Sequence, residues 1–516
     1  MKAKTSLAEE IDPPTIEEIR KAIKRLRNNR AAGTDNIQAE LLKYGGEVVE
    51  QKLGYLISLI WKEERIPEEW NNGIICPIYK KGDQLECSNY RGITLLNLGY
   101  KILFNYIFDK LQPVVDKEIG RYQCGFRSGK STIDQIFCLR QILERTLEFG
   151  IGTHQLFIDY KAAYDNIIRS QLYCALREMN IPDKLVRMIE VTMSNVRGHI
   201  KLRNSLSEPL NITNGLRQGD ALSCLLFNVA LEKVIRDANL QIRGTIFFKS
   251  TQILAYADDL IIIARSFRAL EDSFIALIEA SKKMGLTINI EKTKYMACGK
   301  SFYMDLPQKI KINQYEIEQV NSFRYLGSVV SNTNDIMLEI NARLVNANRA
   351  YFALSPLFRS KLLSLKTKFI IYKTLIVPIL DYASETWPIT ANIEKMLNIF
   401  ERKVLRRIIG PIRERGQWRK RYNKELYGIY GDAPIINVIR AGRIRWAGHL
   451  MRMDNSEVVK RVLTDSPGGS RSRGRPKTRW LDGVEEDLRK IGCRNWKRIA
   501  QDRKAWRKVI EEVKVL

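Results

Sequence analysis

Apolar and polar residues follow two periodicities along this chain, and the first is helical. TIEEIRKAIKRLRNN, near the N-terminus, repeats apolar residues every three to four positions, which predicts an amphipathic helix. Thr15 opens this run and Glu18 follows three residues later, the pattern of a capping box. We expect two further helices, in AAGTDNIQAELLKYGG and over residues 49–64, and a short strand in IICPIYKKGD.

From residue 151 to about 332, strand-like runs alternate with helical ones. HQLFIDY has the composition of a strand, and ILAYADDLIIIA reads apolar, acidic, apolar, which predicts a tight β-hairpin. Further strands are expected in GHIKLRNSLSEPLNITNG, GLTINIEKTKYMACG and FRYLGSVVS, and helices in RSQLYCALREM and ALSCLLFNVALEKVIRDA. From about Asp335 the pattern is helical, as far as the linker-like SPGGSRSRGRP and a Trp-bearing helical segment beyond it. The predicted fold class is α+β.

The length and charge of the chain narrow its function. Its 516 residues suffice for roughly three domains, and a hydrophobic fraction of 45% allows large cores. The net charge of +27 predicts a polyanionic partner, with nucleic acid the first candidate and an anionic membrane surface the second. Residues 341–516 contain 39 Lys and Arg against 17 Asp and Glu, a net of +22, so the basic surface belongs mainly to the C-terminal third.

The cysteines and the hydropathy of the chain indicate an intracellular protein. The eight cysteines are scattered without a CxxC pair and only three histidines occur, so we expect free thiols rather than zinc fingers. The start, MKAKTSLAEEIDPP, lacks the apolar core of a signal peptide, and the longest apolar stretches are too short to span a bilayer. We expect a nuclear or cytoplasmic location and no membrane attachment, because an amphipathic anchor is missing.

Three acidic residues are candidates for catalysis. Asp159 ends the run HQLFID, and Asp258 and Asp259 lie at the tip of the predicted hairpin. Adjacent carboxylates repel each other unless cations neutralise them, and Mg²⁺ is an oxygen-seeking ion that suits such a group. Two ions, Mg²⁺ or Mn²⁺, would hold the attacking and leaving oxygens of a phosphoryl transfer. Taken alone, each motif is better explained as an ordinary acidic turn or strand end.

The order of the short motifs is more specific than any one of them. FIDYKAAYD is followed by RQGDALS, YADD, GLTINIEKTK and FRYLGS, and it is preceded by NYRGITLLN and QCGFRSGKST. This series resembles the reverse transcriptases of non-LTR (LINE-type) retrotransposons over roughly residues 14–332. The resemblance implies a right-hand polymerase fold with fingers, palm and thumb, and a template-directed extension of a primer 3′-OH with dNTPs. RNA would be the template, and DNA the primer or target.

The resemblance also implies roles for individual residues of the catalytic centre. Asp159, Asp258 and Asp259 would be the metal carboxylates. Lys292 or Lys294 would give a proton to the departing pyrophosphate, with Lys292 the choice carried forward.

Five residues are expected to bind the nucleotide. Gln218 and Gly219 would contact the incoming nucleotide and the template. Arg91 and Arg127 are candidates for holding its triphosphate, with an ordinary solvated arginine as the alternative for each. Tyr164 stands five residues after the first catalytic carboxylate, where reverse transcriptases place an aromatic ring that blocks a nucleotide 2′-OH. An aromatic wall at this position favours dNTPs by exclusion, so we expect DNA synthesis.

The resemblance also predicts a primer grip and a domain organisation. Tyr325, Leu326 and Gly327, within FRYLGS, would form the primer grip. We expect an N-terminal extension and fingers at 1–150, a palm at 151–332, a helical thumb at 333–410 and a basic nucleic-acid-binding module at 411–516.

Two features of the C-terminal third suggest nucleic-acid contacts. Arg473-Gly-Arg475-Pro476 resembles the core of an AT-hook, whose arginines enter the minor groove; the alternative is a basic linker that only neutralises phosphates. Four tryptophans are candidates for stacking on bases, although helical spacing favours core packing for most of them: Trp446, Trp480, Trp496 and Trp506.

The chain begins shortly before the polymerase motifs, so we expect an endonuclease activity to come from another chain or from a missing N-terminal domain.

Two alternatives remain open at this point. A decayed or domesticated fragment would bind nucleic acid without polymerising. A group II intron or retron-like reverse transcriptase would share the motifs and differ in its genetic setting.

Overall fold

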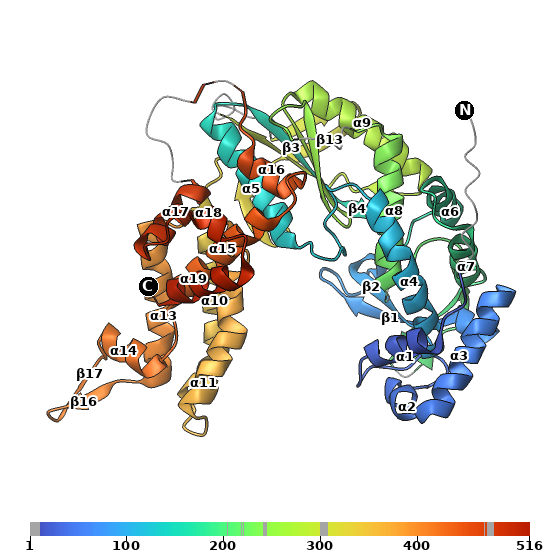
Figure 1. The fold of residues 1–516 in the computed structure, drawn as a ribbon, viewed down its shortest axis with the longest axis horizontal. Helices are drawn as coiled ribbons and strands as arrows, with labels where there is room; N and C mark the ends of the chain where they lie inside the picture. Colours follow the sequence, from blue (N-terminus) through green and yellow to red (C-terminus); the bar gives the residue numbers. More distant parts are fainter. Residues whose placement is uncertain are drawn as a thin grey trace.

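The chain folds as a mixture of helices and sheets around a large central sheet (Figure 1). The computed structural model describes residues 11–203, 205–217, 219, 221–240, 245–299, 308–468, 470–471 and 479–515. Its order of elements confirms the predicted α+β class. In the part of the chain so described, no helix is both long and apolar enough to be a candidate membrane span.

Helices begin the chain, and the first has the predicted cap. The Glu18 N–H donates to Thr15 Oγ1 (3.3 Å), and the Thr15 N–H donates to the Glu18 carboxylate (2.9 Å), which completes the capping box. The helices of this region are α1 (Ile16–Arg25), α2 (Ala39–Tyr44), α3 (Gly46–Glu63) and α4 (Leu98–Glu118). Because α1 contacts both α3 and α4, it closes their apolar faces into the first core of the molecule.

A smaller sheet lies beside these helices. Its strands follow the order β2-β1-β5-β6, with β7 also paired to β5. The strands are β1 (Asn72–Tyr79), β2 (Tyr90–Leu95), β5 (Arg197–Leu202), β6 (Ser205–Leu206) and β7 (Leu210–Asn211). β2 runs antiparallel to β1 and carries the exposed Arg91 near its start, opposite Ile78.

The central sheet has the strand order β12-β13-β11-β3-β9-β8. The strands are β3 (Thr153–Ile158), β8 (Thr251–Tyr256), β9 (Asp259–Ala264), β11 (Lys294–Cys298), β12 (Lys309–Ile312) and β13 (Tyr315–Gln319). Both faces of β3 are covered, since alternate residues point to opposite sides and every residue is buried. Leu156 and Ile158 belong to one core, and Phe157 belongs to another on the opposite face.

Helices on either side of this sheet supply the two cores. The helices of this region are α5 (Thr132–Glu148), α6 (Arg169–Glu178), α7 (Asp183–Met193), α8 (Ala221–Asp237) and α9 (Phe267–Lys283). Two short strands, β4 (Tyr160–Lys161) and β10 (Thr287–Ile288), pair with each other near the end of β3. α8 and α9 pack on the face that contains Leu156, and α5 packs on the face that contains Phe157.

A helical region follows the central sheet. It consists of a hairpin of β14 (Ser322–Tyr325) and β15 (Ser328–Ser331), the helices α10 (Ile336–Arg359), α11 (Leu365–Ile371), α12 (Val377–Asp381) and α13 (Ala391–Ile409), a second hairpin of β16 (Ile412–Glu414) and β17 (Gln417–Arg419), and α14 (Asn423–Tyr430). Its apolar core includes buried residues from Ile336 to Ile439.

The C-terminal helices share a core with the central sheet. They are α15 (Ile435–Arg452), α16 (Val458–Thr464), α17 (Trp480–Lys490), α18 (Trp496–Ile499) and α19 (Arg503–Lys514). Trp446, Trp480, Trp496 and Trp506 are all buried there, with Phe137 of α5 packed edge-on against the first two. Core packing is therefore the role of these tryptophans. Arg473 and Arg475, the AT-hook-like pair, lie outside the described residues.

Candidate active site

The strand register brings the three acidic candidates to one end of the central sheet. β3 and β9 are antiparallel neighbours, and Ile158 pairs with Leu260. Asp159, directly after β3, therefore lies beside Asp259, the first residue of β9. Asp258 lies in the two-residue turn between β8 and β9. Residues almost one hundred positions apart in the sequence thus present their carboxylates at the same edge.

The pKa values of these carboxyls show that they lie within reach of one another's charge. Burial raises the pKa of Asp258, and the charge of Asp159 raises it further, while Arg91 opposes the shift. The pKa of Asp259 is raised to about 6. Burial is the largest cause, followed by the charges of Asp258 and Asp159.

The turn that carries Asp258 is held by a buried glutamine. Ala257 has a φ of 55°, in the left-handed region that two-residue hairpin turns need and that alanine disfavours. Gln123 is 1% exposed, and its side-chain oxygen accepts from the Ala257 N–H (2.8 Å) while its amide donates to the Ala257 carbonyl (3.2 Å). Gly125 leaves room for this contact, since a Cβ there would lie 2.2 Å from the Ala257 nitrogen.

The segment around Gln123 also completes the edge of the sheet. The Ala255 N–H donates to the Tyr122 carbonyl and the Cys124 N–H donates to the Ala255 carbonyl, both at 2.9 Å, which adds a short parallel strand beside β8. Gln123 belongs to the motif QCGFRSGKST, in which the sequence pointed to Arg127 as the candidate functional residue. Gln123 is a positioning residue that the sequence pattern did not single out.

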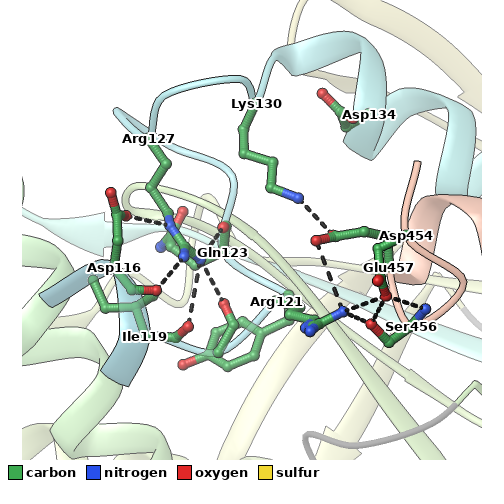
Figure 2. A network of polar contacts seen from close by, with 12 residues as sticks. Asp116, Ile119, Arg121, Gln123, Arg127, Lys130, Asp134, Asp454, Ser456 and Glu457 are labelled. Atoms are coloured by element: carbon green, nitrogen blue, oxygen red, sulfur yellow. Dashed lines mark hydrogen bonds and ion pairs between the residues drawn. The ribbon is translucent and has the colours of Figure 1, made fainter. Parts of the chain in front are cut away.

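The loop that contains Gln123 is tied to the C-terminal helices as well (Figure 2). Lys130 forms an ion pair with Glu457 (2.5 Å). Arg121 faces the same segment and contacts Asp454 (3.4 Å) and the Ser456 hydroxyl. The support of the β8–β9 hairpin therefore includes side chains more than 320 positions further along the chain.

Arg127, one of the two arginines expected at the triphosphate, is engaged with backbone in this structure (Figure 2). Its Nε donates to the Asp116 carboxylate (2.9 Å), and Nη2 donates to the Asp116 carbonyl (2.8 Å). Nη1 donates to the carbonyls of Gly120 (3.0 Å) and Gln123 (3.2 Å). With 10% of its side chain exposed, Arg127 fixes the loop between α4 and α5 rather than facing open solvent.

A cavity of about 320 Å³ beside Asp258 gathers the other nucleotide-binding candidates. Its wall includes Arg91, Tyr164, Gly219, Cys224, Asp258 and Asp259. Tyr164 stacks on Phe227 of α8, with ring centroids 4.6 Å apart, so its ring is fixed in orientation. Burial raises the pKa of the Tyr164 phenol, as do the nearby Cys224 and Asp258, so the hydroxyl stays protonated. Gln218 lies outside the described residues.

A second cavity, of about 330 Å³, opens on the other side of Asp259 and separates the two lysine candidates. Lys292 Nζ lies 3.7 Å from the Asp159 carboxylate, and its side chain is 65% exposed. Lys294 lines the same cavity but donates to Glu318 and to the Glu291 carbonyl, both at 2.6 Å. Of the two, Lys292 has the more available ammonium group.

The predicted primer-grip residues form the turn between β14 and β15. Leu326 and Gly327 have φ values of 45° and 81°, as a type I′ hairpin turn needs. The Tyr382 hydroxyl donates to the Leu326 carbonyl (2.8 Å), and Arg343 donates to the Gly327 carbonyl (2.5 Å). Tyr325 is buried and lines the second cavity, where the charge of Asp259 adds to the burial that raises the pKa of its phenol.

The donor set fits a hard divalent cation in its chemistry. Three carboxylates lie at the same end of the central sheet, and the Asp159 Oδ2 atom is buried without a hydrogen-bond partner. Within the described residues, no group of three or more His, Cys, Asp or Glu side chains is already arranged to hold a metal ion. The site therefore has oxygen ligands of the type that Mg²⁺ binds, and the strand ends bring them to one region. Their side chains are not yet arranged around a single metal position.

Comparison with known proteins identifies the segment that carries this site. Residues 78–330 match the family described as reverse transcriptase (RNA-dependent DNA polymerase). The chain carries a reverse transcriptase domain. All the acidic, nucleotide-binding and primer-grip candidates lie within this domain, whereas the C-terminal arginine pair lies beyond it.

Relatives of the reverse transcriptase domain come from non-LTR transposons. The chain is 23% identical to the probable RNA-directed DNA polymerase from transposon X-element of Drosophila melanogaster, over 76% of this chain and 44% of the relative. It is 23% identical to the RNA-directed DNA polymerase from mobile element jockey of the same species, over 77% of this chain and 44% of the relative. The transposon TX1 149 kDa protein of Xenopus laevis is 24% identical over 50% and 20%. The chain thus spans less than half the length of these relatives.

A solved structure resembles part of the fold. Apo telomerase from Candida tropicalis, truncated from its C-terminal domain, aligns with a TM-score of 0.37 at 14% sequence identity, over 55% of this chain and 60% of that chain.

Proposed function

We propose that this protein is an RNA-directed DNA polymerase that extends a primer 3′-OH with dNTPs. The observation that carries the proposal is the convergence of Asp159, Asp258 and Asp259 at one sheet edge, between two cavities, inside a segment that matches the reverse transcriptase family. The relatives' printed names, which describe RNA-directed DNA polymerases of transposons, support the same activity.

In this proposal the charged residues of the site bind metal ions, donate a proton or bind the triphosphate. Asp159, Asp258 and Asp259 would hold two divalent cations, Mg²⁺ or Mn²⁺, which when bound stabilise the charge on the attacking and leaving oxygens. Lys292, with its exposed ammonium group beside Asp159, would donate a proton to the departing pyrophosphate. Arg91 would bind the triphosphate from the wall of the cavity next to Asp258.

Tyr164 would select the sugar. Its ring is held flat against Phe227, so it stands as a fixed wall of the cavity that also contains Gly219 and Asp258. A 2′-OH on the incoming nucleotide would collide with such a wall, whereas a deoxyribose would fit. We expect Tyr164→Ala to incorporate ribonucleotides in a primer-extension assay that the unaltered protein performs only with dNTPs, and Tyr173→Ala, which changes a tyrosine of α6, serves as the matched control.

The larger assembly follows from the same assignment. Fingers at 1–150, a palm at 151–332 and a helical thumb at 333–410 would enclose an RNA template and a DNA primer, in a right-hand arrangement. Residues 411–516 would add basic nucleic-acid contacts, including Arg473 and Arg475. Cleavage of a DNA target would require an endonuclease that another chain or a further domain supplies.

Primer extension tests the proposal directly. In Asp258→Ala the loss of one carboxylate should abolish extension on a primed RNA template at any Mg²⁺ or Mn²⁺ concentration, while nucleic-acid binding persists. Asp272→Ala, which alters an exposed residue of α9, is the matched control and should extend at the normal rate. Equal extension by all three proteins would refute the assignment.

Binding without any incorporation by the unaltered protein would favour a decayed or domesticated fragment. A maturase-type intron RNA encoded around the gene would instead favour a group II intron-like enzyme. Primer extension and sequencing of the flanking DNA therefore separate the three candidates.

A further inference from the structure

The β16–β17 hairpin is basic and mostly exposed, and it projects beyond α14 away from the central sheet (Figure 1). Residues 411–424 contain six Lys and Arg and one Glu. Trp418 at its middle is 70% exposed, whereas each of the other seven tryptophans of the chain is buried. An exposed aromatic ring beside basic side chains is the combination that stacks on bases and binds phosphates.

One side of the hairpin is fixed to the protein by an ion network. Arg419 binds the Glu425 carboxylate of α14 with both terminal nitrogens (3.0 and 2.8 Å), and it also contacts Glu414 on the neighbouring strand. The Arg419 guanidinium lies over the Tyr422 ring, 4.5 Å from its centroid. Every charge of this network is paired within the protein, so it anchors the hairpin and leaves the opposite side for a partner.

The other side presents Trp418 together with three cations, Arg413, Arg415 and Lys420, none of which forms an ion pair with another described residue, although Arg413 Nε donates to the Gly416 carbonyl (3.3 Å). Trp418 pairs directly with Arg413 across the strands, so the two side chains share the face opposite to Arg419 and Glu414. Arg415 occupies the turn with a φ of 48°, and Lys420 follows the second strand; both are exposed. The face therefore carries one stacking surface with positive charge at both ends.

This chemistry fits an unpaired nucleic-acid strand. An indole ring stacks on a base only where the base is not already stacked and paired, and flanking Arg and Lys then reach the adjacent phosphates. The strands contain three residues each, so the face is about 10 Å long at roughly 3.3 Å per residue, enough for on the order of two nucleotides. The net charge of +27 makes a polyanion the natural partner.

We infer that the β16–β17 hairpin is a separate binding site for single-stranded RNA or DNA, in which Trp418 stacks on a base and Arg413, Arg415 and Lys420 bind neighbouring phosphates. This inference rests on the proposed function only in taking nucleic acid as the partner. The site lies outside the matched reverse transcriptase domain and holds a strand without acting on it.

The tryptophan provides its own probe. Because the other tryptophans are buried, acrylamide should quench mainly the emission of Trp418, and Trp418→Phe identifies that component by removing it. We expect a single-stranded 12-mer, of RNA or DNA, to protect this component from acrylamide at concentrations where anisotropy shows the oligonucleotide to be bound. Blunt duplex, polyglutamate and phosphatidylserine vesicles should leave it accessible. Protection by any of these three and not by single strands would overturn the inference, as would bound oligonucleotide without protection.

Variants measure the strength of the site. Trp418→Ala should weaken single-strand binding by about five- to a hundredfold, while Trp418→Phe, which keeps a ring, should lose much less. Arg413→Gln and Lys420→Gln should each reduce the slope of log affinity against log salt by about 0.7. Tyr55→Ala, which removes a side chain on a residue 71% exposed in α3, is the control and should change neither quantity. Equal affinities for Trp418→Ala and Tyr55→Ala would refute stacking.

Failure of this inference is distinguishable from failure of the polymerase assignment. Asp258→Ala should retain full protection of Trp418 although it no longer extends a primer. Trp418→Ala should retain the rate of nucleotide addition at saturating primer–template. Loss of protection in Asp258→Ala would show that the signal belongs to the catalytic cleft and would overturn the separate site.

Discussion

Two hairpins with charged turns, β8–β9 and β16–β17, are built in opposite ways. The β8–β9 hairpin presents Asp258 from strands that are mostly buried, whereas the β16–β17 hairpin presents Arg415 from strands that are mostly exposed. Each turn contains a residue other than glycine in the left-handed region, Ala257 at φ 55° and Arg415 at φ 48°. The first turn residue has the same left-handed conformation in both hairpins, and the surroundings differ.

The difference lies in what restrains each turn. Gln123 binds both backbone polar groups of Ala257, so the acidic turn is held from outside its own strands. The basic hairpin is anchored at its base through Arg419 and Glu425, and its turn is open to solvent. Chemistry at a phosphoryl group requires positions fixed to a fraction of an ångström, whereas a strand that is merely held tolerates side chains that move. The structure provides restraint where the proposed chemistry takes place.

The largest effect is expected from replacing the charged residue in each of the two hairpin turns by an uncharged amide residue. Asp258→Asn should reduce primer extension by at least about a thousandfold, because the lost ligand charge is worth several kcal/mol of transition-state stabilisation. Arg415→Gln should leave the rate at saturating primer–template unchanged. Steady-state extension assays on the two variants measure this contrast, and comparable losses in both would remove the functional distinction between the hairpins.

The next effect concerns the proton donor beside the acidic hairpin. Lys292→Ala should lower kcat by about a hundredfold and flatten the alkaline side of the pH–rate profile, because its ammonium is the available acid near Asp159. Lys294→Ala should lower thermal stability rather than kcat, since that lysine is committed to Glu318. A kcat loss confined to Lys294→Ala would reverse the assignment of the two lysines.

A smaller effect is expected from loosening the restraint on the acidic turn. Gln123→Leu leaves the buried polar groups of Ala257 without partners, which should destabilise the protein by about 1–3 kcal/mol and lower kcat by about ten- to a hundredfold. Binding of primer–template should be unaffected. Gln51→Leu, at an exposed position of α3, is the matched control. Unchanged kcat in a folded Gln123→Leu protein would show that the turn holds its position by itself.

The smallest effect is thermodynamic and depends on pH. Because the pKa of Asp259 is raised to about 6, the folded protein binds this proton more tightly than the unfolded chain, so stability falls as the pH rises from about 4 to about 6. A divalent cation should offset this loss. Mg²⁺ should therefore raise Tm by about 2–4 °C more at pH 7.5 than at pH 5, and Asp258→Asn should reduce that difference. Equal Mg²⁺ shifts at both pH values would contradict a cation among these carboxylates.

The local parts of the fold were predictable because short-range physics decides them. The capping box of Thr15 and Glu18 and the YADD hairpin are both present where the sequence predicted them. The three carboxylates were predicted from the order of the motifs that contain them, and the strand register places them at one end of the central sheet. Hydrogen bonds and periodicity within ten or so residues suffice for such features.

Residues that act through distant partners were harder to assign. Arg127 was expected to face a triphosphate, yet its donors are occupied by the carbonyls at the end of α4 and by Asp116. Gln123 stands in the same quoted motif and was overlooked, because its partners are backbone groups of residue 257. The sequence around Gln123 does not indicate that its side chain will bind a backbone group 134 positions away.

The sequence by itself determined the alternation of elements, the identity of the acidic residues and the concentration of positive charge in the C-terminal third, because each depends on composition and nearby spacing. Only the tertiary structure decided that the C-terminal tryptophans pack against α5 and the central sheet, that Trp418 alone among the tryptophans faces water, and which lysine remains available beside Asp159. These outcomes depend on contacts between segments hundreds of residues apart, and burial there is set by the fold as a whole.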